Sequence, residues 1–436
     1  MVGWSLDAKS NTRLMKVFKF GGASVKDAAG IKNLLEVIQS HSRGDLVVVI
    51  SAMGKMTNAF ENLVEAYRSD NENLQSGLEE IKAFHRDLIN ELEDSEVIQK
   101  SFDRVITDLE TRLNRQPSDN YDFDYDGIVS FGEVLSTTII SEYLNLRGLH
   151  ANWVDARRLI RTDNTYREGK VDWSKTSELV QEKWNILESM NGRRIMLTQG
   201  FIGHTAELNT TTLGREGSDF SAAIMAFALD AESVTIWKDV PGVLNADPKY
   251  FSDAVLLKRI SYREAIELAY YGASVIHPKT IKPLQNKGIV LNVRSFLKPE
   301  ERGTIIDSST FSDSLVPSYI FKVNQILISF TPRDFSFVNE ANLSELFAEF
   351  VKSGLRIHLM QNSALNFSIC VDYQKEKLDQ LLERFRDRYE VLHNHPCELV
   401  TIRHYDQETI SRLLIGKKVL VEQRSRSTAR MVLVES

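Results

Sequence analysis

The stretch Lys19-Phe20-Gly21-Gly22-Ala23-Ser24-Val25 decides which fold the sequence predicts. It follows an apolar segment, Met15 to Phe20, that predicts a strand. It precedes Lys26 to Ser40, in which apolar residues recur at helical spacing. Two adjacent glycines let the backbone approach an anion closely, and the free amides of a helix N-terminus point at it. The Walker A spacing is absent. Taken alone, a tight turn with an incidental lysine is the simpler interpretation.

Length and composition limit the classes of protein that fit. The 436 residues predict two or three domains, and 42% hydrophobic with 26% charged residues is typical of a globular protein in water. The net charge of −7, without a basic block, argues against a nucleic-acid partner. No apolar run has the length of a membrane span. Two cysteines, Cys370 and Cys397, exclude a disulfide framework and fit a reducing, cytoplasmic setting.

The first fourteen residues are polar and lack the apolar core of a signal peptide. We expect residues 1–14 to be a disordered extension, with Met15 as a candidate for the true start.

Strand and helix patterns alternate over the first two thirds of the chain. Leu46 to Ile50 is wholly apolar, as a central parallel strand covered on both faces would be. Residues 74–113 predict a helical hairpin, and the Asp-rich segment Gln116 to Asp126 is expected to be a loop. Further strands are expected at Ala151–Val154, Ile195–Gln199, Val234–Trp237 and Ile289–Val293, and helices at Trp173–Ser189, Phe220–Leu229 and Tyr262–Tyr271. The pattern predicts a mostly parallel sheet between helices, with ligands at the carboxyl ends of its strands.

Two charged residues stand out against this pattern. Glu133 begins an otherwise apolar helix, where a favourable interaction with the helix dipole is the ordinary explanation. Arg215 lies in a loop before the helix that begins near Phe220, with Ser218 or Asp219 as its cap. Arg215 can grip a carboxylate with two parallel hydrogen bonds, although an exposed arginine beside a helix cap is equally compatible with the sequence.

Eight segments in order resemble the aspartokinases, the branch of the amino-acid kinase family that phosphorylates the side-chain carboxylate of aspartate. Between Lys19 and about Thr304 they are KFGGASV, VVVISAMGKMTN, VSFGEVLST, QGFIG, TTLGREGSDFSAA, WKDVPGVLNADPK, YYGASVIHP and VRSF. Each is weak alone, but eight in sequence are specific. The resemblance implies an α/β catalytic domain over residues 15–304, with the mostly parallel sheet of the amino-acid kinases sandwiched by helices.

The resemblance also implies the residues of the site. Lys19 and Asp219 would be catalytic. Aspartate would be bound by Ser51, Ala52, Thr57, Glu133, Phe201, Arg215 and Ser218. The nucleotide would be bound by Lys19, Phe20, Gly21, Gly22, Lys238, Asp239, Leu244, Asp247, Lys249 and Ser274. The implied cosubstrate is ATP with Mg carried by the nucleotide, and no metal site made by the protein itself is expected.

Some positions depart from the family pattern. Ala23 replaces a usual Thr, Glu216 a common Gly, Leu244 a frequent Tyr, and Ser274 a nucleotide-contacting Lys. Either Lys238 or Lys279 could replace the missing lysine, and the sequence leaves that choice open.

The chemistry of carboxylate phosphorylation fits these residues. A substrate carboxylate has a pKa of about 4, so it is ionised at neutral pH and needs no general base. The difficulty is the approach of two anions, which positive charge and positioning relieve. Lys19, Mg and helix N-termini would supply the charge. Arg215 would hold the α-carboxylate and Glu133 the α-ammonium, leaving the β-carboxylate free to attack.

From Tyr319 the pattern changes to β-α-β-β-α-β. The expected elements are strands at Tyr319–Phe330, Leu355–Met360, Asn366–Asp372 and Glu390–His393, with helices at Leu343–Val351 and Gln374–Arg388. This is the α+β, ferredoxin-like pattern of the ACT domains that regulate aspartokinases. We expect a regulatory region over residues 305–436, with one ACT unit at about 319–395 and a second, abbreviated unit at about 397–436. ACT units commonly pair edge to edge, so a homodimer is expected.

We therefore expect the protein to be a cytoplasmic aspartate kinase. Such an enzyme is a phosphotransferase that converts ATP and L-aspartate into ADP and 4-phospho-L-aspartate. That reaction opens lysine, threonine and methionine biosynthesis. The alternatives are another amino-acid kinase, such as a glutamate or carbamate kinase, and a catalytically weak amino-acid sensor. No nucleic-acid or membrane partner is expected, and an amino-acid effector at the ACT region is compatible with the sequence.

Lysine is the effector that the sequence disfavours. In lysine-sensitive relatives, acidic residues near the second strand of the first ACT unit meet the ammonium groups of lysine. An ungapped alignment of Gly354 to Ala364 with that region places His358 and Ala364 at the acidic positions, with the positive Arg356 beside them. A cationic ligand would lose its counter-charges there.

Overall fold

The computed structural model describes residues 15–69, 73–189, 192–251, 253–273, 276–334 and 336–436. The expected N-terminal extension, residues 1–14, and Ser274 lie outside these ranges. Two compact units make up the chain: Met1–Val243, Lys258–Ala265 and Val275–Ser309 form the first, and Leu244–Leu257, Ile266–Ser274 and Thr310–Ser436 form the second. In the part of the chain that the structure describes, every helix is too short or too polar to cross a bilayer.

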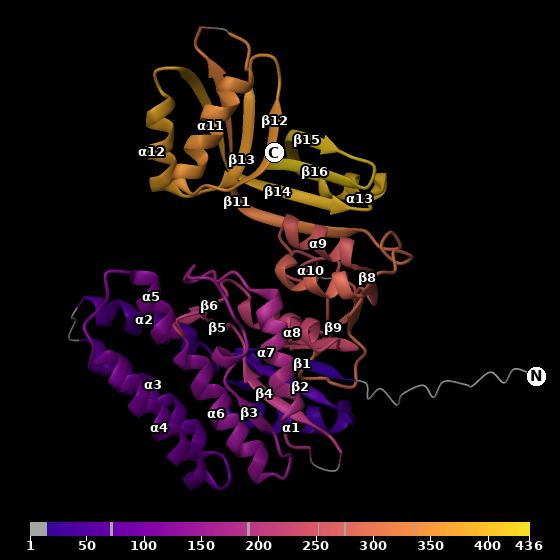
Figure 1. Ribbon diagram of the computed structural model, residues 1–436. Helices are drawn as coiled ribbons and strands as arrows, with labels where there is room; N and C mark the ends of the chain where they lie inside the picture. The colour runs from indigo at the N-terminus through magenta and orange to yellow at the C-terminus, as the bar shows by residue number, and fades with distance from the viewer. Residues whose placement is uncertain (1–14, 70–72, 190–191, 252, 274–275, 335) are drawn as a thin grey trace, which may run out of the picture. The chain divides into compact units, whose positions relative to one another are not determined.

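An eight-stranded sheet forms the centre of the first unit (Figure 1). Its strands are β1 (Lys16–Phe20), β2 (Leu46–Ile50), β3 (Asn152–Val154), β4 (Ile195–Gln199), β7 (Ser233–Lys238), β8 (Arg259–Ser261), β9 (Val290–Ser295) and β10 (Thr304–Asp307). The order is β3-β4-β2-β1-β7-β9-β10-β8, and the pairs are parallel except for β9 with β10. The predicted mostly parallel sheet is confirmed.

The helices in this part of the chain pack against the sheet or against one another. They are α1 (Ala28–His41), α2 (Met56–Arg68), α3 (Asn73–Asn90), α4 (Ser95–Leu113), α5 (Tyr121–Val129), α6 (Phe131–Leu146), α7 (Trp173–Asn185), α8 (Gly217–Ala228), α9 (Tyr262–Tyr271) and α10 (Pro278–Lys287), with short 3-10 turns at Gly22–Val25 and Ala156–Arg158. Helix α9 begins in the first unit and ends in the second. Helices α3 and α4 lie side by side, which confirms the predicted hairpin.

The alternation of side chains along β1 assigns the two faces of the sheet. Phe18 and Phe20 belong to one large apolar core with residues of α1 to α6. Lys19 points to the opposite face, where it forms an ion pair with Asp219 of α8. Helix α8 therefore covers one face of β1 and α1 covers the other.

The Asp-rich segment expected to be a loop is helical from Tyr121 onward, so that prediction was wrong. Asn120 caps α5 by accepting hydrogen bonds from the amides of Asp122 and Phe123. Asp124 is fully buried and is held by Arg68 of α2 and by Arg112 of α4, whose Nη2 lies 2.6 Å from Oδ1. These partners are distant in sequence, so the polar composition concealed a helix that packs against its neighbours.

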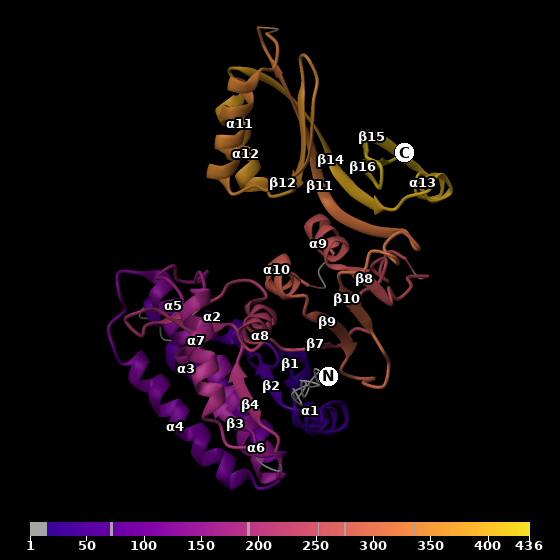
Figure 2. The same cartoon turned by 45° about the vertical axis from the view of Figure 1, so that its right-hand side comes forward.

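A six-stranded antiparallel sheet forms the second unit (Figure 2). Its strands are β11 (Ser318–Pro332), β12 (Ile357–Asn362), β13 (Phe367–Asp372), β14 (Tyr389–Arg403), β15 (Lys417–Arg424) and β16 (Thr428–Glu435), with helices α11 (Glu340–Ser353), α12 (Lys375–Phe385) and α13 (Gln407–Leu413). The order is β12-β13-β11-β14-β16-β15. The predicted succession of strands and helices is confirmed, and the sheet has the expected ferredoxin-like, ACT-like character.

One feature of this sheet differs from the expectation. The strand expected at Glu390–His393 and residues Leu399–Arg403, at the start of the expected second ACT unit, are two halves of the single strand β14. The first half of β11 pairs with the second half of β14, from Ser318 opposite Arg403 to Lys322 opposite Leu399. The second ferredoxin-like unit thus obtains a strand from the first half of β11, whose second half pairs with β13 in the first ferredoxin-like unit.

Candidate active site

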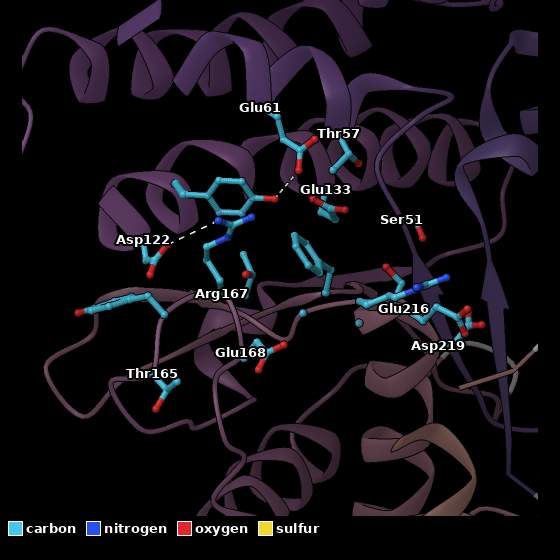
Figure 3. A pocket seen from close by; sticks show the side chains of 18 of the residues that line it. Ser51, Thr57, Glu61, Asp122, Glu133, Thr165, Arg167, Glu168, Glu216 and Asp219 are labelled. Carbon is cyan, nitrogen blue, oxygen red and sulfur yellow. Dashed lines mark hydrogen bonds and ion pairs between the residues drawn. The ribbon is translucent and has the colours of Figure 1, made fainter. Parts of the chain in front are cut away.

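The carboxyl ends of β1, β2, β4 and β7 meet at one edge of the sheet, and a pocket of about 770 Å³ opens there (Figure 3). Its lining combines both signs of charge. The lining residues are Lys19, Ser51, Thr57, Glu61, Asp122, Tyr125, Glu133, Thr165, Tyr166, Arg167, Glu168, Phe201, Thr212, Gly214, Arg215, Glu216, Gly217, Ser218, Asp219 and Lys238. In the view of Figure 3, Ser51, Glu216 and Asp219 lie on one side, and Glu61, Asp122 and Arg167 on the other.

A buried carboxylate between two ammonium groups forms the floor of the pocket. Asp219 in the first turn of α8 has a side chain that is 3% exposed. Its Oδ1 lies 2.7 Å from Nζ of Lys19, and its Oδ2 lies 3.4 Å from Nζ of Lys238. Burial alone would raise the pKa of Asp219, but the two lysines outweigh it and hold the pKa below its ordinary value. The floor therefore carries net positive charge at neutral pH.

Glycines bring the strand ends close to α8. A Cβ at Gly200, directly after β4, would lie 2.5 Å from Cβ of Ser218, so no larger residue fits. A Cβ at Gly217 would lie 2.7 Å from the ring of Phe201. The N-terminal turn of α8, with Ser218 and Asp219, is thereby held against the sheet edge, where its free amides face the pocket.

Glu133 is a pocket-lining residue whose carboxyl group is buried. It lies in the first turn of α6 and is 2% exposed. Its Oε1 accepts a hydrogen bond of 3.2 Å from the amide of Ala52, whereas its Oε2 has no hydrogen-bond partner among the described residues. Burial raises the pKa of Glu133 to about 8. A buried carboxyl group with an unpartnered oxygen suits a cationic group of a ligand.

Several residues around the pocket have left-handed backbone conformations. Phe201 has φ 71°, Glu216 φ 54° and Arg167 φ 64°, values that are strained for residues other than glycine. Two hydrogen bonds hold Phe201: its amide donates to Oγ of Ser221 at 2.9 Å, and its carbonyl accepts from the amide of Leu213 at 2.8 Å. Such strain is concentrated at functional sites, where the fold over-determines the geometry.

Most of the expected aspartate-binding residues gather in this pocket. Ser51, Thr57, Glu133, Phe201, Arg215 and Ser218 line it, and Ala52 contributes its amide to Glu133. Of the expected catalytic and nucleotide-binding residues, Lys19, Asp219 and Lys238 line it as well. Arg215 is exposed, and none of the described residues forms an ion pair with it.

The other expected nucleotide-binding residues have different positions. Gly21 directly follows β1, and a Cβ there would lie 3.4 Å from Nζ of Lys19. The ring of Phe20 is fully buried and stacks on Trp237, so only its backbone lies at the strand end. Asp239 follows β7. Leu244, Asp247 and Lys249 belong to the second unit, and Ser274 lies outside the described residues.

The two candidate replacement lysines differ in their contacts. Lys238 contacts Asp219 as described above. Lys279 of α10 donates from Nζ to the carbonyl of Leu213 at 3.3 Å, and a Cβ at Gly214 would lie 3.7 Å from the same Nζ. Lys238 thus lies at the first turn of α8, and Lys279 lies beside the segment that leads into this helix.

A group of pocket residues was missed by the sequence analysis. It comprises Glu61, Asp122, Tyr125, Thr165, Tyr166, Arg167, Glu168 and Thr212. The guanidinium of Arg167 lies 4.2 Å from the ring centre of Tyr125, and the hydroxyl of Tyr125 donates to Oε1 of Glu61 at 2.6 Å. Tyr125 and Asp122 lie on the helix α5 that was expected to be a loop. Arg167 lies outside the motifs, and no local sequence pattern indicates that it belongs to the site.

The pKa of Glu133 predicts a pH-dependent stability. Its folded-state pKa of about 8 lies above the ordinary value of 4.5, so the folded protein keeps a proton that the unfolded chain loses between these values. Stability from this group is complete below pH 4.5 and is lost as pH rises toward 8. Glu133→Gln should therefore raise the apparent melting temperature more at pH 8 than at pH 5. The corresponding difference in the free energy of unfolding is on the order of a few kcal/mol.

The exposed Glu182→Gln on α7 serves as the matched control and should shift both melting temperatures equally. Equal gains for Glu133→Gln at the two pH values would contradict the raised pKa.

The family model described as "Amino acid kinase family" matches residues 15–295. The chain is 30% identical to lysine-sensitive aspartokinase 3 of Escherichia coli over 357 residues, which cover 82% of this chain and 78% of that protein. It is also 30% identical to the chloroplastic bifunctional aspartokinase/homoserine dehydrogenase 2 of Arabidopsis thaliana, covering 86% of this chain but only 42% of the length of that relative.

Solved structures agree with the sequence comparison. E. coli aspartokinase III in complex with lysine and aspartate superposes with a TM-score of 0.81 and 26% identity, covering 97% of this chain and 96% of that chain. The same enzyme in complex with aspartate and ADP gives a TM-score of 0.77 and 25% identity, covering 96% of each chain. The fold, the order of the motifs and these similarities lead to one conclusion: the chain belongs to the aspartokinases of the amino acid kinase family.

Proposed function

We propose that this protein is an aspartate kinase, which transfers the γ-phosphoryl group of ATP to the β-carboxylate of L-aspartate. The products are ADP and 4-phospho-L-aspartate. The observation that carries the proposal is a single pocket with net positive charge at its floor and, on its walls, a buried carboxyl group and a guanidinium that pairs with no carboxylate of the described residues.

Glu133 and Arg215 have the chemistry to orient an α-amino acid. The unpartnered Oε2 of Glu133 is a natural acceptor for an α-ammonium group, which would draw the proton off this carboxyl. Arg215 is exposed and forms no ion pair with any residue in the described ranges, so its planar fork is available for the α-carboxylate. With both α groups held, the β-carboxylate is left for the phosphoryl group.

Lys19 and Lys238 have the chemistry to stabilise the transferring phosphoryl group. Asp219 holds both ammonium groups at the end of the sheet, next to the N-terminus of α8. The two lysines would lessen the repulsion between the phosphoryl oxygens and the carboxylate nucleophile. The role of Asp219 is then to position these lysines, since an ionised substrate carboxylate requires no base.

ATP and Mg enter this proposal as substrate and as an ion carried with it. The free space at Gly21, in front of Nζ of Lys19, fits the approach of a phosphate group. Mg supplies charge neutralisation on the phosphate oxygens when it is bound. Lys238 and Asp239 of the first unit, and Leu244, Asp247 and Lys249 of the second, stay expected nucleotide-binding residues, as do Gly22 and Ser274.

Two alternatives are weaker. Another amino-acid kinase, acting on glutamate or carbamate, would not need Glu133 and Arg215 together with an ACT-like region. A catalytically weak sensor would have no use for two lysines around a buried carboxylate. We also propose, from the family resemblance, residues 15–304 as the catalytic domain, a regulatory region from residue 305, a homodimer, a cytoplasmic location, and a place in lysine, threonine and methionine biosynthesis.

Lys19→Met tests the catalytic role of the ammonium group. It should lower kcat by on the order of 100-fold or more, with a smaller effect on aspartate affinity, because Lys19 acts on charge that develops in the transition state. ADP release, measured with and without aspartate, gives the rate. The exposed Lys32→Met should leave kcat unchanged, and an unchanged kcat in Lys19→Met would remove Lys19 from the mechanism.

Arg215→Ala tests substrate orientation. It should raise the KM for aspartate strongly while leaving the KM for ATP nearly unchanged, and Arg215→Lys should restore little because one ammonium cannot reproduce the planar fork. The exposed Arg43→Ala is the control for loss of charge. A kinetically silent Arg215→Lys would show that the bidentate grip is wrong.

The absence of inhibition by lysine is the expected regulatory behaviour. Nε2 of His358 lies 2.9 Å from Oδ2 of Asp372, and Oδ1 of Asp372 accepts a hydrogen bond from Gln325, so both oxygens of this carboxylate already have contacts. Burial lowers the pKa of His358. A cationic effector would have to displace these contacts to reach Asp372. Titration of lysine and of threonine into the ADP-release assay decides between effectors. Inhibition by lysine at sub-millimolar concentration, lost in His358→Ala, would contradict the charge argument.

A further inference from the structure

A second cavity, of about 210 Å³, lies on the sheet face opposite to Asp219. Lys19 points to the face that α8 covers, and its neighbour Phe18 points to the other. The cavity is lined by Lys16, Phe18, His41, Ser233, Thr235, Asn292, Arg294, Arg302 and Ile305. It lies within the first unit, on β1, β7, β9 and β10, beside the C-terminal end of α1.

The floor of this cavity is polar where a parallel sheet is ordinarily apolar. Thr235 of β7 lies in register between Phe18 of β1 and Asn292 of β9. Central strands of a parallel sheet are expected to be apolar on both faces. This face is not simply wetted by solvent, because Ser233 is 9% and Thr235 5% exposed. No described residue accepts or donates a hydrogen bond at either hydroxyl, so both are available to a ligand.

The rim of the cavity is cationic. Within the described residues, no carboxylate forms an ion pair with Lys16, Arg294 or Arg302. Arg294 stacks at 5.0 Å from the ring centre of Trp237 and donates from Nε to the carbonyl of Glu301 at 3.3 Å, which fixes its guanidinium beside the cavity. Burial lowers the pKa of Arg294, although the charge of Glu300 opposes this, as expected for a cation without a close carboxylate.

We propose that this cavity binds a small oxyanion with two or more negative charges. Three cationic side chains and two free hydroxyls converge on one concave, partly buried space, and guanidinium and ammonium groups form their strongest hydrogen bonds with phosphate and carboxylate oxygens. The volume is below that of pockets for drug-sized ligands, so a small metabolite fits and a nucleotide does not. The proposal is independent of the kinase reaction, because this site and the Lys19–Asp219 pair lie on opposite faces of β1.

Isothermal titration of the full chain with sodium pyrophosphate and, separately, with citrate tests the proposal. Ionic strength is held constant, and a Lys19→Met background removes one of the two ammonium groups of the active-site pocket and so weakens binding of the probes there. We expect sub-millimolar binding of at least one probe. Arg302→Gln and Lys16→Gln should each weaken it by about tenfold, and the double variant should abolish it. Arg302 is exposed in a loop, so its variant folds even if Arg294→Gln, which loses the contact with Trp237, does not.

Lys32→Gln on α1 is the matched control, since it removes one positive charge outside the cavity and should bind like the parent. Binding of pyrophosphate alone identifies a phosphate site, binding of citrate alone a polycarboxylate site, and binding of both a site selective for charge. The proposal is overturned if neither probe binds up to about 10 mM, or if Arg302→Gln and Lys16→Gln bind as tightly as Lys32→Gln.

Discussion

The buried carboxylate of Asp219 must be paired, and this requirement organises the catalytic unit. A carboxylate that is 3% exposed is tolerated only because Lys19 of β1 and Lys238 of β7 approach it from two adjacent parallel strands. A slip of one residue in β1 would move Lys19 to the face of Phe18 and place a lysine in the apolar core. The pairing of Asp219 therefore determines the register of the sheet, the position of α8 and the charge of the pocket together.

The fold could be predicted wherever local pattern and tertiary environment agree. The apolar segment Leu46–Ile50 and helix Tyr262–Tyr271 begin and end where the sequence indicates. Helix α5 was missed because the partners of Asp124, Arg68 and Arg112, come from distant segments, and composition does not reveal such pairs. The continuity of β14 was missed for a similar reason, since its two halves serve different ferredoxin-like units.

The site could be predicted as far as its motifs extend. Lys19, Glu133 and Asp219 lie far apart in sequence and meet in one pocket, as the order of the motifs implies. The opposite wall could not be predicted: Arg167 is placed by stacking on Tyr125, an interaction that neither residue signals alone. The strained backbone of Phe201 and Glu216 is likewise a property of the assembled fold, in which a Cβ at the neighbouring Gly217 would lie 2.7 Å from the ring of Phe201.

The interleaving of the two units has a consequence for synthesis on the ribosome. Residues 244–257 and 266–273 belong to the second unit, but they emerge well before Thr310–Ser436, which provide most of that unit. Phe251, for example, stacks on Tyr319 at 4.8 Å between ring centres. Until those later residues are made, the early segments have no surface to pack against, and their apolar side chains face solvent or chaperones. Nascent chains of this protein should thus be captured most readily when they end between about residue 275 and the completed C-terminus.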